Sequence, residues 1–296
     1  MSHLTATAPA SQAPLRASAA GTHGLTFVGV LRSEWIKFWS LMSTKLLLVI
    51  SFVAMIGLST FGAWGNAYGM SEMGKNPGRF GPTAAQLPDP NSIMGSVATV
   101  GQYLGVPVIG ALAVMFIASE YSTGMIRSSF AAVPGRLPVF WAKAIILVVI
   151  SYVLSVVAFF ASFALDAAIF KAYGFDVSLS GKGTLSTIFL TGVYVAGAVL
   201  LGLALGALLR NSAGAIVILV GLIFVLPIAG NFLGLIPGDF WKYLPDYFPS
   251  EAGARMATAL DHTNGKLDAW QGGLVYLGWI LLAAIPALVL LKKRDV

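Results

Sequence analysis

One segment of this 296-residue chain comes close to a known nucleotide-binding pattern. Gly69 to Asn76 match G-x-x-x-x-G-K-[ST] except at the last position, where Asn76 lacks the hydroxyl group that would bind magnesium. A phosphate loop also follows a β-strand, and no strand pattern precedes this segment. We therefore expect no ATP or Mg²⁺ to bind to this chain itself.

Residues that usually build a hydrolytic or metal site are few. The three histidines, His3, His23 and His262, lie outside the long apolar stretches, and the chain has no cysteine and no HExxH motif. Intramembrane proteases need such groups inside a helix. The sequence therefore predicts a non-catalytic chain without a metal or cofactor, and a lipid-modifying enzyme is the weakest of the functions considered.

Asp166 is the charged residue that comes nearest to the interior of an apolar stretch. Proton- or sodium-coupled carriers usually place an acid or base in the middle of the membrane. Asp166 is expected at the outer end of its stretch, so the clearest signature of such a carrier is missing. An ATPase-independent carrier or channel nevertheless stays open as the alternative function.

Six uncharged apolar stretches must position these few polar residues. Each is long enough to cross the hydrocarbon core, which takes about 20 residues of helix. Charged residues make up 10% of the chain, whereas soluble domains carry about 25%. The sequence thus predicts an all-α membrane protein with one domain over residues 25–296, after a disordered cytoplasmic tail over residues 1–24. The expected spans are Leu46–Ser71, Asn91–Ser119, Ala144–Leu165, Gly183–Leu209, Asn211–Gly238 and Ala269–Leu291.

The distribution of charge predicts the orientation. With both termini inside, the inner segments hold eleven of the 18 Lys and Arg residues but only three of the 12 acidic ones, Glu34, Glu120 and Asp295. Basic residues near span ends face the cytoplasm in most membrane proteins. Both termini are therefore expected in the cytoplasm. The basic residues lie in short clusters at span ends, which favours contact with lipid headgroups over nucleic acid.

Two inner segments have helical patterns of their own. Thr26–Met42 predicts an amphipathic helix in the inner interface, in preference to a cytoplasmic extension of the first span. The Glu120–Lys143 loop predicts a short helix that begins at Ser122 or Thr123 and stops at Pro134-Gly135. The apolar face of the first helix is expected to comprise Phe27, Leu31, Trp35, Phe38 and Met42, and that of the second Met125, Ile126 and Phe130.

Three further patterns concern packing and connections. Ala198, Gly202 and Gly206 form a small-residue stripe that suits close helix packing, either inside the subunit or at a dimer contact. Prolines and glycines from Pro227 to Gly238 are expected to interrupt the fifth stretch. The loop from Asn66 to Pro90 is expected to be irregular, and Trp241–Met256 is expected to lie against or re-enter the outer leaflet.

Both inner segments resemble motifs of a known family. Leu31-Arg32-Ser33-Glu34-Trp35-Ile36-Lys37 resembles the start of permeases of the bacterial type-2 ABC exporter class. Glu120-Tyr121-Ser122-Thr123-Gly124-Met125-Ile126-Arg127 resembles the signature after their second span, with Pro134, Arg136 and Lys143 following in order. Leu244-Pro245 and Phe248 to Gly253 resemble the stretch before their last span.

The resemblance implies a permease of the bacterial cytoplasmic membrane that exports an amphiphilic or lipid-like substrate. It would pair with a second permease copy or a homologue, and separate cytoplasmic ATPase subunits would bind ATP and Mg²⁺. An interfacial elbow helix with Arg32, Glu34, Trp35 and Lys37 would precede the first span. The loop after the second span would form a coupling helix. The residues implied in ATPase coupling are Glu120, Gly124, Met125, Ile126, Arg127, Phe130 and Arg136.

Physical roles can be assigned to these coupling residues. Gly124 would allow a sharp turn out of the second span. Met125 and its apolar neighbours would fill a groove on the ATPase, and Arg127 and Arg136 would pair with its acidic residues. Glu120 would bind Arg127 or Lys143. The alternative for the basic residues is that they only anchor the chain to anionic lipid.

Overall fold

The computed structural model describes residues 26–75, 88–126, 128, 133, 135–181, 183–233, 235–258 and 267–293, and its regular elements there are all helices. Six helical segments are long and apolar enough to cross a membrane. The chain is therefore a multi-pass membrane protein, as predicted. The six spans are α2 (Met42–Lys75), α3 with α4 (Pro90–Ser122), α6 (Leu137–Ala172), α7 (Thr184–Leu209), α8 to α9 (Ser212–Leu233) and α12 (Ala269–Lys293).

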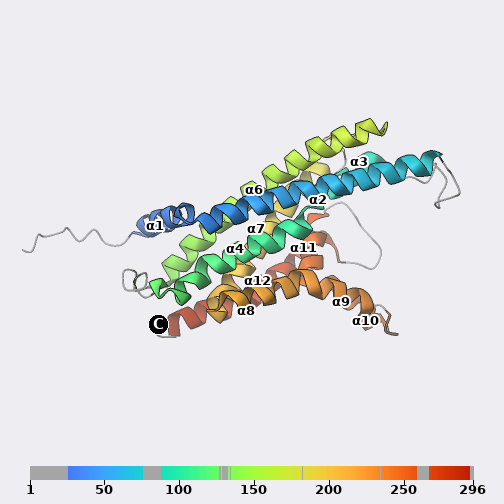
Figure 1. Ribbon diagram of the computed structural model, residues 1–296. Helices are drawn as coiled ribbons and strands as arrows, with labels where there is room; N and C mark the ends of the chain where they lie inside the picture. The colour runs from blue at the N-terminus through green and yellow to red at the C-terminus, as the bar shows by residue number, and fades with distance from the viewer. Residues whose placement is uncertain are drawn as a thin grey trace, which may run out of the picture.

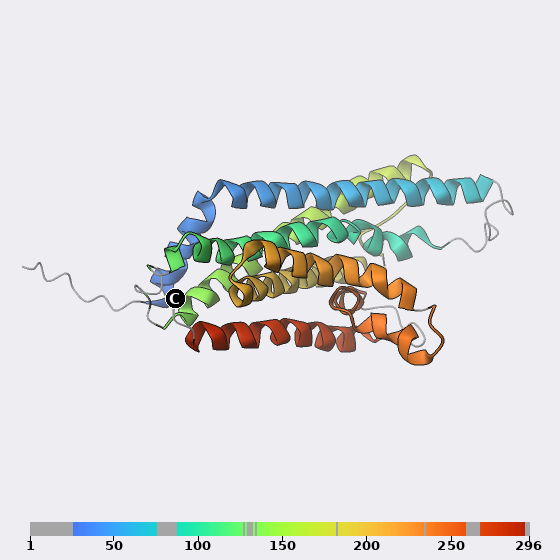
Figure 2. The same cartoon turned by 60° about the horizontal axis from the view of Figure 1, so that its bottom comes forward.

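The spans run side by side in one bundle with α7 at its centre (Figures 1 and 2). Small residues allow α7 to approach α4 closely. A Cβ atom on Gly202 would come within 2.7 Å of the Gly110 carbonyl oxygen, and one on Gly206 within 2.7 Å of Ile117. Ala198 is also fully buried. The stripe of Ala198, Gly202 and Gly206 thus packs inside the chain, which was one of the two alternatives.

Helix α1 (Phe27–Ser40) lies at the end of the bundle where α12 also ends (Figure 1). Leu41 has an extended backbone that separates α1 from α2. Val30, Glu34 and Phe38 are the side chains by which α1 is buried in the bundle. Of the predicted apolar face, Phe27, Trp35 and Met42 are exposed, so they are available to lipid.

Two helices extend well beyond their uncharged stretches. Helix α2 continues to Lys75, where Glu72 and Lys75 form an ion pair of 3.1 Å one turn apart. The prediction of an irregular loop from Asn66 was therefore wrong as far as Lys75. The same extension makes the phosphate-loop-like segment helical up to Lys75, so its backbone amides are not arranged as a phosphate-binding loop; Asn76 lies outside the described residues. At about 1.5 Å per residue, the 36 residues of α6 span about 54 Å, well beyond a hydrocarbon core of about 30 Å.

The second span is interrupted between α3 (Pro90–Thr99) and α4 (Gln102–Ser122). At this point the backbone hydrogen bonds join residues three apart instead of four: the Val100 amide donates to the Val97 carbonyl, and the Leu104 amide donates to the Gly101 carbonyl. Gly101 packs against the backbone of α2, where a Cβ atom would collide with the Met55 carbonyl oxygen. Glycine at this position lets the interrupted span lie directly on α2.

The fifth span is helical beyond the expected interruption. It comprises α8 (Ser212–Val220), a π-helical turn η2 (Gly221–Val225) and α9 (Leu226–Leu233). The wider turn directly precedes Pro227, which cannot donate a backbone hydrogen bond. The helix thus continues past Pro227 and Gly230 but ends at Leu233, so that, as predicted, it does not run straight through all the prolines and glycines up to Gly238.

Three short helices connect the fifth span to the sixth. They are α10 (Asp239–Tyr243), the 3-10 helix η3 (Leu244–Tyr247) and α11 (Pro249–Ala257). Helix α11 packs against α7 and α12, and a Cβ atom on Gly253 would collide with the ring of Tyr194. The predicted amphipathic segment thus folds back onto the bundle in its second half.

Candidate functional site

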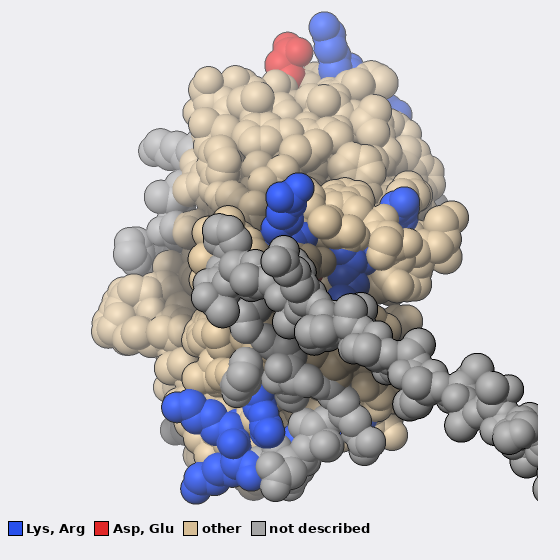
Figure 3. Space-filling view, turned by 90° about the vertical axis from the view of Figure 1, so that its left-hand side faces the viewer, with Lys and Arg blue, Asp and Glu red and all other residues tan. Residues whose placement is uncertain are grey.

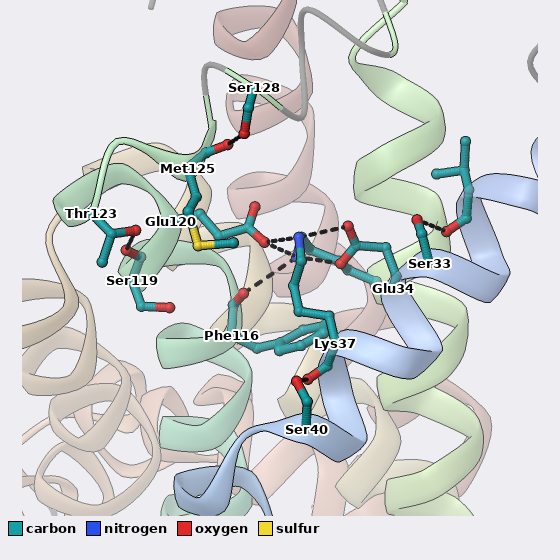
Figure 4. A network of polar contacts seen from close by, with 12 residues as sticks. Ser33, Glu34, Lys37, Ser40, Phe116, Ser119, Glu120, Thr123, Met125 and Ser128 are labelled. Atoms are coloured by element: carbon teal, nitrogen blue, oxygen red, sulfur yellow. Dashed lines mark hydrogen bonds and ion pairs between the residues drawn. The ribbon is translucent and has the colours of Figure 1, made fainter.

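Four charged side chains from three helices meet at the end of the bundle where α1 lies and α12 ends (Figure 1). Figure 4 shows Glu34, Lys37 and Glu120 of this group from close by. Glu34 and Lys37 come from α1, Glu120 comes from the last turns of α4, and Lys143 comes from α6. We call these four residues the charge cluster. It joins the two sequence segments that were singled out as inner motifs.

Each ammonium group of the charge cluster contacts both carboxylates. Lys143 Nζ lies 2.6 Å from Glu34 Oε2 and 2.7 Å from Glu120 Oε1. Lys37 Nζ lies 3.0 Å from Glu34 Oε1 and 2.5 Å from Glu120 Oε1. Two positive and two negative charges balance, so the cluster is neutral as a whole. Such charge-assisted hydrogen bonds are short and about twice as strong as neutral ones.

Water is largely excluded from the charge cluster. The Lys143 side chain is 0% exposed, and Glu34 and Glu120 are buried as well. The Lys143 ammonium lies 4.2 Å from the centre of the Phe116 ring and 3.5 Å from the Phe116 carbonyl oxygen. Only Lys37 is partly accessible. Because buried charges are costly unless paired, these contacts hold the three helices in one arrangement.

The local sequence explains why the four residues meet. On α1, Glu34 and Lys37 are three residues apart and therefore share a face. The neighbouring Phe38 packs edge to face on Phe116, with ring centroids 5.3 Å apart, and so fixes α1 over α4. Glu120 follows Phe116 by one helical turn. The apolar pair thus places the charged pair directly over Lys143.

The charge cluster keeps Lys37 protonated. Burial lowers the pKa of Lys37, but its hydrogen bond and attraction to Glu120, and then to Glu34, outweigh burial, so that the pKa rises above its ordinary value of 10.5. Glu120 Oε2 has no hydrogen-bond partner among the described residues. All four side chains take part in ion pairs, so the arrangement fastens the three helices together.

Directly after Glu120 the chain turns away from α4. Gly124 has φ of +74°, a conformation that glycine adopts without strain, as the predicted sharp turn requires. Met125 is 48% exposed, whereas Ile126 is 2% exposed and packs in the core. Ile126 therefore anchors the turn to the core of this chain. Arg127 and Phe130 lie outside the described residues.

The other basic residues at this end have separate places. Arg136 directly precedes α6, with φ of +53°, and donates a hydrogen bond of 3.3 Å to the Leu291 carbonyl in the last turn of α12. Arg210 lies 5.0 Å from the centre of the Tyr121 ring. Arg32 is exposed on α1. Figure 3 shows Lys and Arg side chains spread over this face of the molecule.

Sequence reasoning missed the burial of Asp166 and the importance of Lys143. Asp166 on α6 is 0% exposed and accepts a hydrogen bond from Ser59 on α2. The available signal was that Asp166 lies closer to the interior of an apolar stretch than any other charged residue. Lys143 was named as part of the resembling motif and as one of two possible partners of Glu120, but its contact with Glu34 was not predicted. Within the described ranges, no group of three or more His, Asp or Glu residues could hold a metal ion.

Comparison of the sequence with protein-family models and with curated proteins found no match.

Proposed function

We propose that this chain is the membrane-spanning permease subunit of an ATP-driven exporter, powered by separate ATPase subunits that bind at the α1 end. Two copies, or one copy and a homologue, would form the path for an amphiphilic or lipid-like substrate. The chain itself would bind neither ATP nor Mg²⁺. The proposed location is the bacterial cytoplasmic membrane, with both termini and the α1 end in the cytoplasm.

The observation that carries this proposal is the charge cluster. The two segments that resemble type-2 exporter permeases lie 83 residues apart in sequence, yet Lys37 from the first binds Glu120 from the second. A chance resemblance of two short segments would not require them to meet through their charged residues. Their contact supports the interpretation of both as parts of one working unit.

The geometry suits the transmission of a displacement that a cytoplasmic partner would cause at the α1 end. The connection from Glu120 to Lys143 begins and ends at members of the charge cluster, and Met125 is exposed on its first turn. A partner that moved Met125 would displace the ends of α4 and α6. Through Glu34 and Lys37 the same displacement would reach α1 and then α2. The cluster would thus make four helices respond together.

The exposed face of α1 supports the elbow-helix role. Phe27 and Trp35 are exposed and sit on the helix that the cluster fastens to the bundle. Aromatic side chains of this kind prefer the level of the lipid headgroups. With the exposed Arg32 beside them, they would hold α1 in the inner interface.

The test is copurification and activity of the ATPase partner. We expect the tagged full chain, extracted in mild detergent, to bring down an ATPase with Walker motifs whose activity depends on the permease. Met125→Asp should abolish both copurification and stimulation, because it places a charge at the exposed contact. Leu179→Asp, an exposed apolar position in the connection after α6, is the matched control and should leave both unchanged. A stable permease that recovers no ATPase would refute the proposal.

The second candidate function is an ATPase-independent carrier. The fully buried Asp166 favours it, because acids inside a transmembrane bundle often serve ion-coupled transport. Transport by the purified chain in liposomes without ATP would support this candidate over the exporter.

A further inference from the structure

A second buried polar site lies far from the charge cluster, where α2, α3 and α6 meet. Ser59 Oγ lies 2.9 Å from Asp166 Oδ2 and 2.9 Å from the Val97 carbonyl oxygen. Asp166 and Ser59 are both 0% exposed. Lys143 and Asp166 are 23 residues apart on α6, or about 34 Å along the helix, so this site is independent of the charge cluster.

An ionised Asp166 would have one close hydrogen-bond donor among the described residues, the Ser59 hydroxyl. Ser59 has a single proton and two acceptors at equal distance, and of these the Val97 carbonyl oxygen also accepts the Val100 amide. Asp166 Oδ1 has no hydrogen-bond partner among the described residues. The hydroxyl of Thr60, the neighbour of Ser59, lies beside Asp166 as a second and weaker donor, although it makes no close hydrogen bond to any described residue. One more proton on Asp166 would complete a chain in which Asp166 donates to Ser59 and Ser59 donates to Val97.

The electrostatic surroundings also disfavour a negative charge on Asp166. Val97 belongs to the last turn of α3, and the carbonyl end of a helix carries partial negative charge. Neither α3 nor α7 contains a charged residue. On α6 the nearest charge is the exposed Lys171, and on α2 Glu72 and Lys75 pair with each other thirteen or more residues beyond Ser59. No cation faces the carboxyl group among the described residues.

We propose that Asp166, Ser59 and the Val97 carbonyl oxygen form a proton-binding site inside the bundle. Its ligand is a single proton carried by the Asp166 carboxyl group. The spacing of 2.9 Å on both sides of Ser59 is that of O–H···O hydrogen bonds, which fits a proton and leaves no room for a metal ion between the oxygens.

The site adds a buried polar connection between three helices. Asp166 on α6 reaches α2 through Ser59, and Ser59 reaches the carbonyl end of α3. Loss of the proton would leave a buried carboxylate beside a carbonyl oxygen, with one hydroxyl proton between them. Packing of α2 on α3 and α6 is therefore linked to proton occupancy, whether or not an ATPase drives the protein.

The site lies toward the end of the bundle opposite α1. Trp64 on α2 donates a hydrogen bond of 3.1 Å to the Tyr173 hydroxyl, and Tyr68 stacks on Trp64. Exposed aromatic residues of this kind mark the headgroup level. Ser59 precedes Trp64 by five residues on α2 and therefore lies about 8 Å farther into the bundle. The site thus lies nearer to this far end of the bundle than to the charge cluster.

Infrared spectroscopy of the full chain in lipid nanodiscs tests the proposal directly. At neutral pH we expect a carbonyl-stretch band of a protonated carboxyl group that shifts on transfer to D₂O. Asp166→Asn should remove this band, whereas Asp176→Asn, which changes an exposed carboxylate just after α6, should leave it unchanged. Ser59→Ala should shift the band, because it removes the hydrogen-bond partner of the carboxyl group.

Several results would overturn the proposal. Absence of the band from the wild type would mean that Asp166 is ionised, and a band that survives Asp166→Asn or ignores Ser59→Ala would belong to another residue. Loss of the band when sodium replaces choline in the buffer would assign the site to a metal cation. If Asp166→Asn does not fold, the wild-type spectra in the two buffers and the Ser59→Ala spectrum still decide. None of these measurements involves an ATPase, so they stand apart from the proposed transport function.

Discussion

Replacing Lys143 with methionine tests whether the charge cluster fastens the helices. The substitution Lys143→Met keeps the length of the side chain but removes the ammonium group that lies 2.6 Å from Glu34 and 2.7 Å from Glu120. Lys37 alone would then balance two buried carboxylates. Breaking a buried ion pair by removing one partner costs about 3–5 kcal/mol, since the other charge stays buried. The contact with the Phe116 ring would add to this loss.

The assay is reversible unfolding of the purified chain in bicelles, followed by circular dichroism as sodium dodecyl sulfate is added. We expect Lys143→Met to lower the free energy of unfolding by about 3–5 kcal/mol. Lys292→Met is the matched control, because Lys292 is exposed at the same end of the bundle. Exposed substitutions of this kind usually change stability by less than about 0.5 kcal/mol.

A double variant separates charge imbalance from lost packing. Combining Lys143→Met with Glu120→Gln leaves Glu34 and Lys37 as one balanced pair. We expect this double variant to be more stable than Lys143→Met alone, although it carries one substitution more. A loss below about 1 kcal/mol for Lys143→Met, the value of a surface ion pair, would show that the cluster is solvated and would refute the reasoning.

Three other predictions concern packing, pH and docking. Gly202→Leu should disrupt the contact with Gly110 and lower the yield of folded protein, with an overpacking cost of at least about 1–3 kcal/mol. Gly57→Ala is the control, because a Cβ atom there meets nothing within 4 Å, and it should be neutral or stabilising in the same detergent assay. The pKa of Lys37 is raised, so its ion pairs contribute fully to stability below pH 10.5 and are lost as the pH rises through the higher folded-state value. The difference in stability between wild type and Lys37→Met should therefore stay constant at neutral pH and shrink only in strongly alkaline buffer. Met125→Asp should abolish ATPase recovery while the circular dichroism spectrum stays that of the wild type.

The spans were predictable because lipid imposes a simple length and composition on them. Helix ends were not, since a helix can leave the bilayer and continue in water. Glu72 and Lys75 illustrate this, because their charges end the apolar stretch while their ion pair supports another turn of α2. Pro227 is the opposite case, where a wider turn absorbs the missing hydrogen bond and the helix continues. Both differences arise from local hydrogen bonding that composition does not reveal.

The site was predictable in its residues more than in its contacts. Glu34, Lys37 and Glu120 were singled out by their motifs, but their meeting depends on the direction in which α1 folds back after Leu41. Asp166 was judged by its position along the chain, which gives depth but not burial. Only the packing of α2 and α3 around it shows that the carboxyl group is enclosed.

The position of the charge cluster in the chain has a consequence for biosynthesis. Its last member is Lys143, whereas α7 begins only at Thr184, so all four residues are synthesised before any part of α7. Chains are synthesised from the amino terminus, and early segments can assemble first. The fastening of α1 to α4 and α6 can therefore form while the remaining spans are still entering the translocon. The central helix α7 would then insert against α1, α4 and α6 after these helices had already been joined by the charge cluster.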